Sequence, residues 1–140
     1  MSFSQTDFLF LTMPNTLSKE ERLKSQKQIE LLFEKGSAIT KFPFKLLYLS
    51  SNEENASSIR AGFVVPKRNF KSAVKRNRIK RLLREAYRTD KPLYFNNIEG
   101  KYALMILYLG KEMPTFDRVE KGIKQLLASF IEKTSHEESK

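Results

Sequence analysis

The amino-acid sequence predicts a mixed α+β domain in which helices and strands alternate along the chain. Segments with apolar residues every three or four positions, the spacing of an amphipathic helix, alternate with short apolar runs bounded by Gly, Pro or polar residues, which are typical of strands. The length of 140 residues favours one compact domain. We assign residues 17–133 to this domain, residues 1–16 to a flexible N-terminal extension and residues 134–140 to a loose polar tail.

The N-terminal extension contains an apolar patch at residues 8–11, with the sequence FLFL. The patch is four residues long, has no basic flank before it and adjoins Asp7. It therefore has the properties of neither a signal peptide nor a membrane span. It is either part of a disordered extension or a segment that packs onto the domain.

The first half of the domain is predicted to contain one helix followed by strands. Ser25 and Gln28 have the spacing of a capping box, and apolar residues at helical spacing follow until Gly36 ends the helix. Polar residues 51–58 are expected to form a hairpin-like loop. The predicted strands cover residues 39–42, 45–50 and 60–65.

The second half is predicted to contain a basic helix at residues 74–88, a buried strand at residues 102–109 and a final helix. Thr115 can cap the final helix, which has one apolar stripe. The residues of that stripe are Phe116, Val119, Ile123, Leu126, Leu127, Phe130 and Ile131.

Positive charge is concentrated in one part of the chain, whose formal net charge is +10. Residues 66–88 contain ten Lys or Arg and a single acid, Glu85, a net charge of +9, whereas the remainder holds 16 basic and 15 acidic residues. A nearly neutral body with one strongly positive segment is typical of a polyanion-binding surface. The ten basic residues are Lys67, Arg68, Lys71, Lys75, Arg76, Arg78, Lys80, Arg81, Arg84 and Arg88.

The basic helix has two predicted faces at 100° per residue. The face expected to dock on the sheet holds Ile79, Leu82, Leu83, Ala86 and Tyr87. The opposite face is expected to form a solvent-facing ridge of Asn77, Arg81, Arg84 and Arg88, with Arg78 and Lys80 on its flanks. The alternative, a helix surface neutralised by salt bridges, needs acids at three- or four-residue spacing, and only Glu85 is available, as a partner for Arg81.

Cations also occupy the start of this helix. Lys75, Arg76 and Arg78 lie in its first turns, where the helix dipole disfavours each cation by about 0.3–1 kcal/mol. A bound phosphate would remove this conflict, because helix N-terminal amides and arginine side chains both favour it. We therefore expect the start of the helix to bind a nucleic-acid backbone.

Several kinds of chemistry find no support in the sequence. The chain has no cysteine, which excludes a disulfide scaffold, a thiolate metal site and a cysteine nucleophile. Its one histidine, His136, falls in the predicted tail, and neither a carboxylate cluster nor metal-ligand spacing is evident. We expect no catalytic residue, no metal site, no membrane association and no obligatory protein partner.

Charge and periodicity alone leave two other binding classes to weigh. A ribosomal or general RNA-binding protein could use the same basic helix. A DNA-binding helix-turn-helix protein is disfavoured, because the candidate recognition helix follows a strand and no partner helix immediately precedes it.

The sequence resembles the bacterial ribonuclease P protein family at Lys67-Arg68 and at residues 73–86, AVKRNRIKRLLREA, which include Arg-Asn-Arg at residues 76–78. The resemblance covers about residues 17–133. The family is the small protein subunit of a ribonucleoprotein that removes the 5′ leader of precursor tRNA. Membership would imply tRNA processing by a cytoplasmic ribonucleoprotein endonuclease, a hydrolase. The family's other marks in this sequence are Arg22-Leu23-Lys24, Phe33, Gly36, Phe44 and Gly62.

The resemblance implies a two-layer α/β sandwich of the ribosomal protein S5 domain 2-like kind, ordered helix, three strands, helix, strand, helix. It also implies a left-handed β-α-β crossover around the basic helix, where general topology rules predict a right-handed one. In this family the basic helix contacts the catalytic RNA. The residues with this implied role are Lys75, Arg76, Asn77, Arg78, Lys80, Arg81, Arg84 and Arg88.

The resemblance further implies a cleft between the first helix and the sheet that binds the leader by aromatic stacking. Phe33 matches one stacking position, although a core role is equally open to it. Ile29 and Leu47 stand where the family has aromatics, and Tyr48 would enter the cleft only with a shifted register. The predicted cleft and rim residues are Phe33, Phe44, Lys45, Tyr48, Arg60, Lys67 and Arg68.

The resemblance assigns metal-dependent phosphodiester hydrolysis to an RNA subunit. The protein would reduce phosphate repulsion and help to hold the substrate. Mg²⁺ is then expected to bind through the RNA, and the protein itself to bind no cofactor. The implied partners are ribonuclease P RNA and precursor tRNA.

Overall fold

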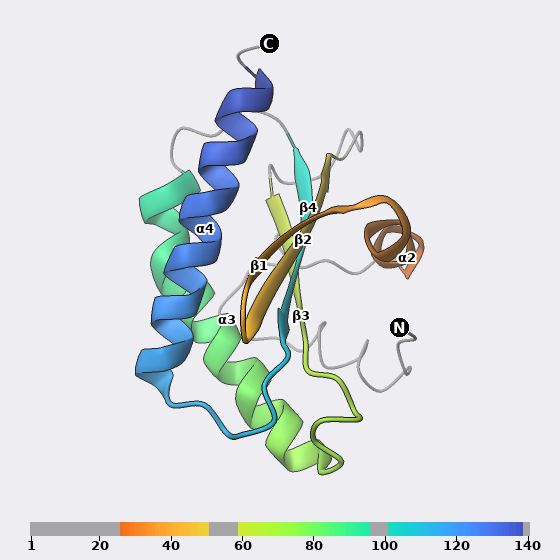
Figure 1. Cartoon of the computed structure of the whole chain (residues 1–140), viewed down its shortest axis with the longest axis vertical. Helices are drawn as coiled ribbons and strands as arrows, with labels where there is room; N and C mark the ends of the chain where they lie inside the picture. Colours follow the sequence, from red (N-terminus) through yellow and green to blue (C-terminus); the bar gives the residue numbers. More distant parts are fainter. Residues whose placement is uncertain (1–25, 51–58, 96–100, 139–140) are drawn as a thin grey trace.

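The structure, a computed structural model, describes residues 26–50, 59–95 and 101–138. Its element order is the predicted one: a helix, three strands, a helix, a strand and a helix (Figure 1). The elements are α2 (Gln26–Lys35), β1 (Ser37–Lys41), β2 (Phe44–Ser50), β3 (Ile59–Val64), α3 (Ala73–Phe95), β4 (Tyr102–Tyr108) and α4 (Phe116–Glu138). The apolar patch at residues 8–11, Ser25 and the predicted loop at residues 51–58 lie outside the described residues.

The four strands form one sheet in the order β1-β2-β4-β3. β1 pairs antiparallel with β2, and β2 antiparallel with β4, whereas β3 and β4 are parallel neighbours. A parallel pair needs a crossover connection, and α3 is the helix of that connection. The α+β sandwich is thus confirmed, and the left-handed sense of the crossover stays a prediction.

Helices cover both faces of the sheet. α3 and α4 lie side by side on one face, and α2 lies on the other (Figure 1). All seven residues of β4 are buried. A strand buried on both faces reads as a continuous apolar run, and this explains why residues 102–109 lack the alternation of a half-exposed strand.

Ring contacts show which strand residues face α4. Tyr48 and Tyr102 both contact Phe130 of α4, with ring centroids 5.2 Å and 5.3 Å apart. Phe44 faces the same helix, because a Cβ added at Gly122 of α4 would lie 2.3 Å from Cδ2 of its ring. The alternate residues of β2, including Lys45 and Leu47, therefore point toward the α2 side of the sheet.

The helix ends show where the predictions held and where they were wrong. Gly36 ends α2, its amide donating to the carbonyl of Leu32 at 3.0 Å, and the Thr115 hydroxyl accepts from the amide of Arg118 at 3.3 Å, as predicted. The basic helix does not end at residue 88 but continues through Pro92 to Phe95. Likewise, α4 runs to Glu138 rather than becoming loose after residue 133.

The extension of α4 beyond residue 133 has a local cause. Thr134, the first residue of the predicted tail, is buried, and its hydroxyl donates to the carbonyl of Phe130 at 2.9 Å. A polar residue whose hydrogen bond is made inside the helix can be buried without a large desolvation cost. The polar composition of the tail gave no sign of this.

Asp90 of α3 is a buried carboxyl group that weakens the fold at neutral pH. It is only 2% exposed, and its Oδ2 atom has no hydrogen-bond partner in the described part of the chain. Burial raises the pKa of Asp90, with a further increase from Glu120, while Lys124 acts in the opposite direction. The charged form of Asp90 is therefore less favourable in the folded chain than in the unfolded chain.

Asp90→Asn is expected to raise the melting temperature at pH 7. Below the ordinary Asp pKa, the Asp90 carboxyl group is protonated in both the folded and the unfolded chain, and its burial costs little stability. The loss of stability from burying the charged form begins as the pH rises through that value and is complete above the raised pKa of the folded chain. Thermal unfolding at pH 7 and pH 4 checks this, with the exposed Glu132→Gln in the second half of α4 as the control. The idea fails if Asp90→Asn lowers the melting temperature at pH 7 or raises it equally at both pH values.

Candidate nucleic-acid interface

The connection from β3 to α3 fixes the start of the basic helix. Residues 66–70 form a turn in which the amides of Asn69 and Phe70 both donate to the carbonyl of Pro66. The hydroxyl of Ser72 then accepts from the amide of Lys75 at 3.3 Å and caps α3. This cap was not predicted, although a Ser shortly before a predicted helix is a usual signal for one.

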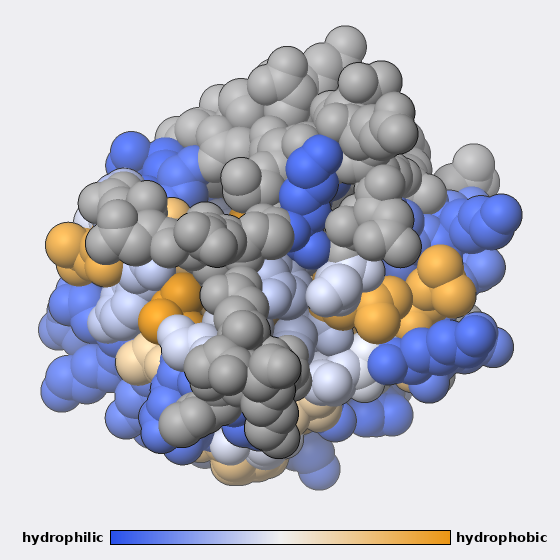
Figure 2. All heavy atoms as spheres, turned by 90° about the horizontal axis from the view of Figure 1, so that it is seen from above, coloured by the Kyte–Doolittle hydropathy of each residue, from blue (hydrophilic) through white to orange (hydrophobic). Residues whose placement is uncertain are grey.

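Six cations of this region are exposed, namely Lys67, Arg68, Lys71, Lys75, Arg78 and Arg81, and we call them the cationic surface. They lie on the β3–α3 connection and on the first turns of α3, with no acid between residues 66 and 84. The opposite end of the molecule, seen from above in Figure 2, mixes hydrophilic and hydrophobic residues over its described surface. The exposed cations of residues 66–88 named above therefore lie at the end where α3 begins.

Three predicted surface cations of α3 are instead buried. Arg76, Lys80 and Arg84 are 4%, 2% and 5% exposed. Because they are spaced four residues apart, they form one stripe along the helix. This stripe lies beside the apolar face that was predicted to be buried, and Ile79, Leu83, Ala86 and Tyr87 of that face are indeed buried. Placing Arg84 on a solvent-facing ridge was wrong.

Each arginine of the buried stripe has an identified contact. Arg76 donates from Nη1 to the carbonyl of Phe70 at 2.7 Å and to that of Lys71 at 3.0 Å. The guanidinium carbon of Arg84 lies 6.0 Å from the ring centroid of Phe63, within the range of a cation–π contact. Arg76 therefore braces the turn that carries Lys67, Arg68 and Lys71.

Arg76→Gln is expected to lower the melting temperature of the protein, whereas Arg78→Gln is expected to leave it almost unchanged. The shorter Gln side chain cannot reproduce the two bonds to the carbonyls, and an unsatisfied buried polar group costs about 1–3 kcal/mol. Thermal unfolding monitored by circular dichroism checks this. Equal melting temperatures for the two variants would show that Arg76 does not hold the turn.

Glu85 pairs with Arg88 rather than with Arg81. Arg88 Nη2 lies 2.5 Å from Glu85 Oε1, and this partner lowers the pKa of the Glu85 carboxyl group. Both side chains remain close to half exposed, so the pair contributes little to stability. It partly neutralises Arg88, and the exposed Arg81 keeps its full charge for another partner.

Asn77, which was predicted to lie on the solvent-facing ridge of the basic helix, is half-buried.

The predicted leader-cleft residues divide between the two faces of the sheet. Phe44 and Tyr48 belong to the core between the sheet and α4, so placing them in a cleft beside α2 was wrong. Lys45 faces the α2 side, as does Arg60, which pairs with Ala103 of β4. Phe33 of α2 is half-buried against the core.

Lys67 and Arg68 lie on the exposed connection after β3. Lys45 lies near the same end of the sheet, because it pairs with Leu107 of β4, which also pairs with Val64 at the end of β3. Lys67 and Arg68 therefore join the exposed RNA-contact candidates Lys75, Arg78 and Arg81 at this end.

The described residues contain no group of three His, Cys, Asp or Glu side chains that could hold a metal ion. Within the same ranges, no helix is long and apolar enough to cross a membrane.

Comparison with known proteins gives a consistent result. A model of the ribonuclease P family, described as "Ribonuclease P", matches residues 17–130. The chain is 36% identical over 122 residues to the ribonuclease P protein component of Porphyromonas gingivalis, covering 84% of this chain and 89% of the relative. It is 33% identical over 126 residues to that of Chlorobium phaeobacteroides, covering 81% and 86%.

Solved structures agree with the fold. The ribonuclease P protein from Thermotoga maritima superimposes with a TM-score of 0.62 at 25% identity, covering 76% of this chain and 94% of that one. The Staphylococcus aureus protein gives a TM-score of 0.61 at 20% identity, covering 77% and 93%.

Proposed function

The chain belongs to the family of ribonuclease P protein components, and on that premise we propose that it binds the catalytic RNA through the cationic surface and helps to hold the 5′ leader of precursor tRNA. Membership gives it a role in tRNA processing by ribonuclease P, as part of an endoribonuclease complex whose partner is ribonuclease P RNA. We also propose a cytoplasmic location, where the substrate would be met.

The observation that carries this proposal is the exposure of six cations at one end of the molecule, on the connection to α3 and its first turns. The positive end of the α3 dipole lies at the same place, and its first turn contains no acid. Both features favour phosphate and disfavour a protein surface of like charge. Because Arg78 and Arg81 are exposed and Arg76 is buried, we propose that Arg78 and Arg81 contact the RNA and that Arg76 braces the turn before α3.

We assign the bond-breaking chemistry to the RNA subunit, with Mg²⁺ bound through that RNA. In this proposal the protein supplies positive charge where phosphates of the catalytic RNA and of the substrate approach one another. Screening of that repulsion lowers the Mg²⁺ concentration that the reaction needs. The leader would then lie along the α2 side of the sheet, where Lys45 and Arg60 face, with Phe33 at its border.

Reconstitution tests this function. The full chain is mixed with a bacterial ribonuclease P RNA, and cleavage of a 5′-labelled precursor tRNA is followed at low and at high Mg²⁺. We expect strong stimulation at low Mg²⁺ and little at high Mg²⁺. A protein that bound random RNA equally well and did not stimulate cleavage would be a general RNA-binding protein instead.

A further inference from the structure

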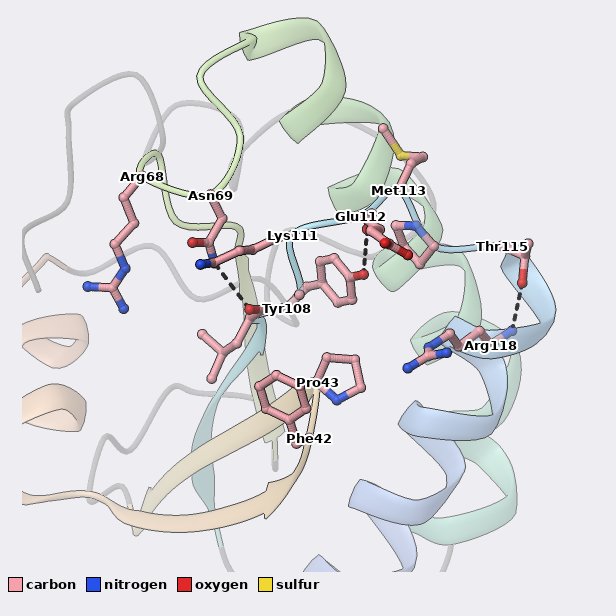
Figure 3. Close-up of a pocket in the computed structure, with 13 residues that line it drawn as sticks. Phe42, Pro43, Arg68, Asn69, Tyr108, Lys111, Glu112, Met113, Thr115 and Arg118 are labelled. Carbon is pink, nitrogen blue, oxygen red and sulfur yellow. Dashed lines mark hydrogen bonds between the residues drawn. The ribbon is translucent and has the colours of Figure 1, made fainter.

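A pocket of about 870 Å³ opens at the same end of the molecule, beside the cationic surface, with which it shares Arg68 (Figure 3). Three connections meet there: the β1–β2 turn, the β3–α3 connection and the β4–α4 connection. The residues used below are Phe42, Arg68, Tyr108, Lys111, Glu112 and Arg118, all of which line it.

The pocket is positively charged. Arg68, Lys111 and Arg118 line it, against one acid, Glu112, and all four are exposed. Arg68 and Arg118 lie on opposite sides of the pocket in Figure 3. The 23-residue helix α4 begins at Phe116, directly after the capping residue Thr115 that lines the pocket, so its positive dipole end also borders the pocket.

The pocket also presents an aromatic ring that the fold does not need. Phe42 is 76% exposed, the highest value among the exposed large apolar side chains of the described residues. Its neighbours in the pocket are fixed: Tyr108 is buried and its hydroxyl donates to the carbonyl of Glu112 at 2.5 Å, and Asn69 donates to the carbonyl of Leu109 at 3.1 Å. A rigid pocket with one free ring has little to reorganise when a flat ligand arrives.

An exposed ring between cations has the chemistry that single-stranded nucleic acid needs, because a base stacks on the ring while its phosphates meet the cations. The excess of cations in the pocket attracts a polyanion such as RNA and repels the surface of another basic protein. The cationic surface leads directly into the pocket, because Arg68 belongs to both.

We infer that this pocket receives an unstacked nucleotide of single-stranded RNA, whose base stacks on Phe42 and whose phosphates contact Arg68, Lys111 and Arg118. This inference rests on the proposed function and extends the RNA contacts from α3 to the β4–α4 connection. The nucleotide comes either from ribonuclease P RNA or from the leader of precursor tRNA, and the shared chemistry is an unpaired base with its phosphates.

The test uses the full chain with two probes: ribonuclease P RNA alone, and precursor tRNA added to the reconstituted holoenzyme, with and without its leader. Phe42→Ala is expected to weaken binding of one probe about tenfold, within the range measured for loss of a single base–aromatic stack, and Phe42→Tyr to restore it. Leu93→Ala, which removes another exposed apolar side chain at the far end of α3, is the matched control and should change neither affinity.

The cations are tested by Lys111→Gln together with Arg118→Gln. The control removes the same charge from Lys121 and Lys133, which are exposed on α4 and do not line the pocket. The variant that lacks the Lys111 and Arg118 charges is expected to reduce the slope of log K against log salt concentration by roughly 1.4–1.8. The variant that lacks the Lys121 and Lys133 charges should reduce this slope much less.

Weaker binding of the catalytic RNA assigns the nucleotide to that RNA, and weaker binding only of leader-bearing substrate assigns it to the leader. Unchanged affinity for both probes in Phe42→Ala would overturn the inference. If Arg78→Gln with Arg81→Gln still weakened RNA binding in the same assay, the proposed function would stand without the pocket. A change in self-association of Phe42→Ala, with RNA affinity intact, would identify a protein interface and overturn the inference as well.

Discussion

Replacing Arg78 and Arg81 together with Gln is expected to weaken binding of ribonuclease P RNA severely and to leave the fold intact. Both side chains are exposed on the first turns of α3. If each contacts one phosphate, the slope of log K against log salt concentration falls by roughly 1.4–1.8 for the pair. The loss of affinity is therefore largest at low salt. Titration of labelled RNA at several salt concentrations measures affinity and slope together.

The control for this experiment removes two charges from a different helix, α4, without touching the cationic surface. Lys121→Gln with Lys133→Gln serves, since both residues are exposed on α4. Thermal unfolding of the Arg78→Gln, Arg81→Gln protein should match that of the original chain. An unchanged salt slope would show that these arginines meet no phosphate, and the RNA would then have to bind another surface.

Replacing Gly122 with Val is expected to lower the melting temperature by roughly 3–10 °C. A Cβ at this position would lie 2.3 Å and 2.4 Å from two carbons of the buried Phe44 ring, a distance that neither backbone nor ring can accept without moving. Overpacking of a core costs about 1–3 kcal/mol, and Val adds two further carbons beyond the Cβ. Thermal and urea unfolding measure the loss.

Two comparisons make this prediction specific to the contact between Gly122 and Phe44. Ala128→Val adds a branched residue at an exposed position of the same helix and should have a small effect. In a Phe44→Ala background, where the ring is absent, Gly122→Val should cost less than in the original chain, by a coupling of about 0.5–3 kcal/mol. Additive losses in the double variant would mean that α4 and β2 do not meet at this point.

Periodicity predicted the order of the elements because each strand and helix carries its own local signal. Alternation also established that Phe44, Leu46 and Tyr48 share one face of a strand and Lys45 and Leu47 the other. It could not say which face would meet which helix, because helices cover both sides of this sheet. The assignment of Phe44 to the leader cleft failed for that reason. Tyr48 stays out of the cleft because the shifted register that would bring it there does not occur.

The basic helix shows a second limit of structure prediction from sequence patterns. A helical wheel separates Ile79 from Arg81 correctly, but it treats every arginine as a surface residue. Arg76 lies on the border of the buried arc, and only the tertiary position of the Phe70 and Lys71 carbonyls gives its guanidinium a reason to turn inward. Charge counting therefore located the binding surface and overestimated how many of its cations are free to bind.

The pocket residues escaped sequence analysis because they come from three connections that are distant in the chain. Phe42 precedes β2, Arg68 follows β3, and Lys111 and Arg118 flank the start of α4. Phe42 falls in the strand predicted at residues 39–42 and Arg118 in the predicted final helix, so neither was expected to join Arg68 in one site.

The parallel pairing of β3 with β4 makes the molecule directional. Both strands end at the same edge of the sheet, so α3 and α4 begin at one end and run toward the other (Figure 1). A fluorophore attached at residue 133 of α4 would stand roughly 26 Å along the helix axis from its first turn, at 1.5 Å per residue. Such a label would report the arrival and orientation of the protein on its RNA, with the dye held clear of the contact.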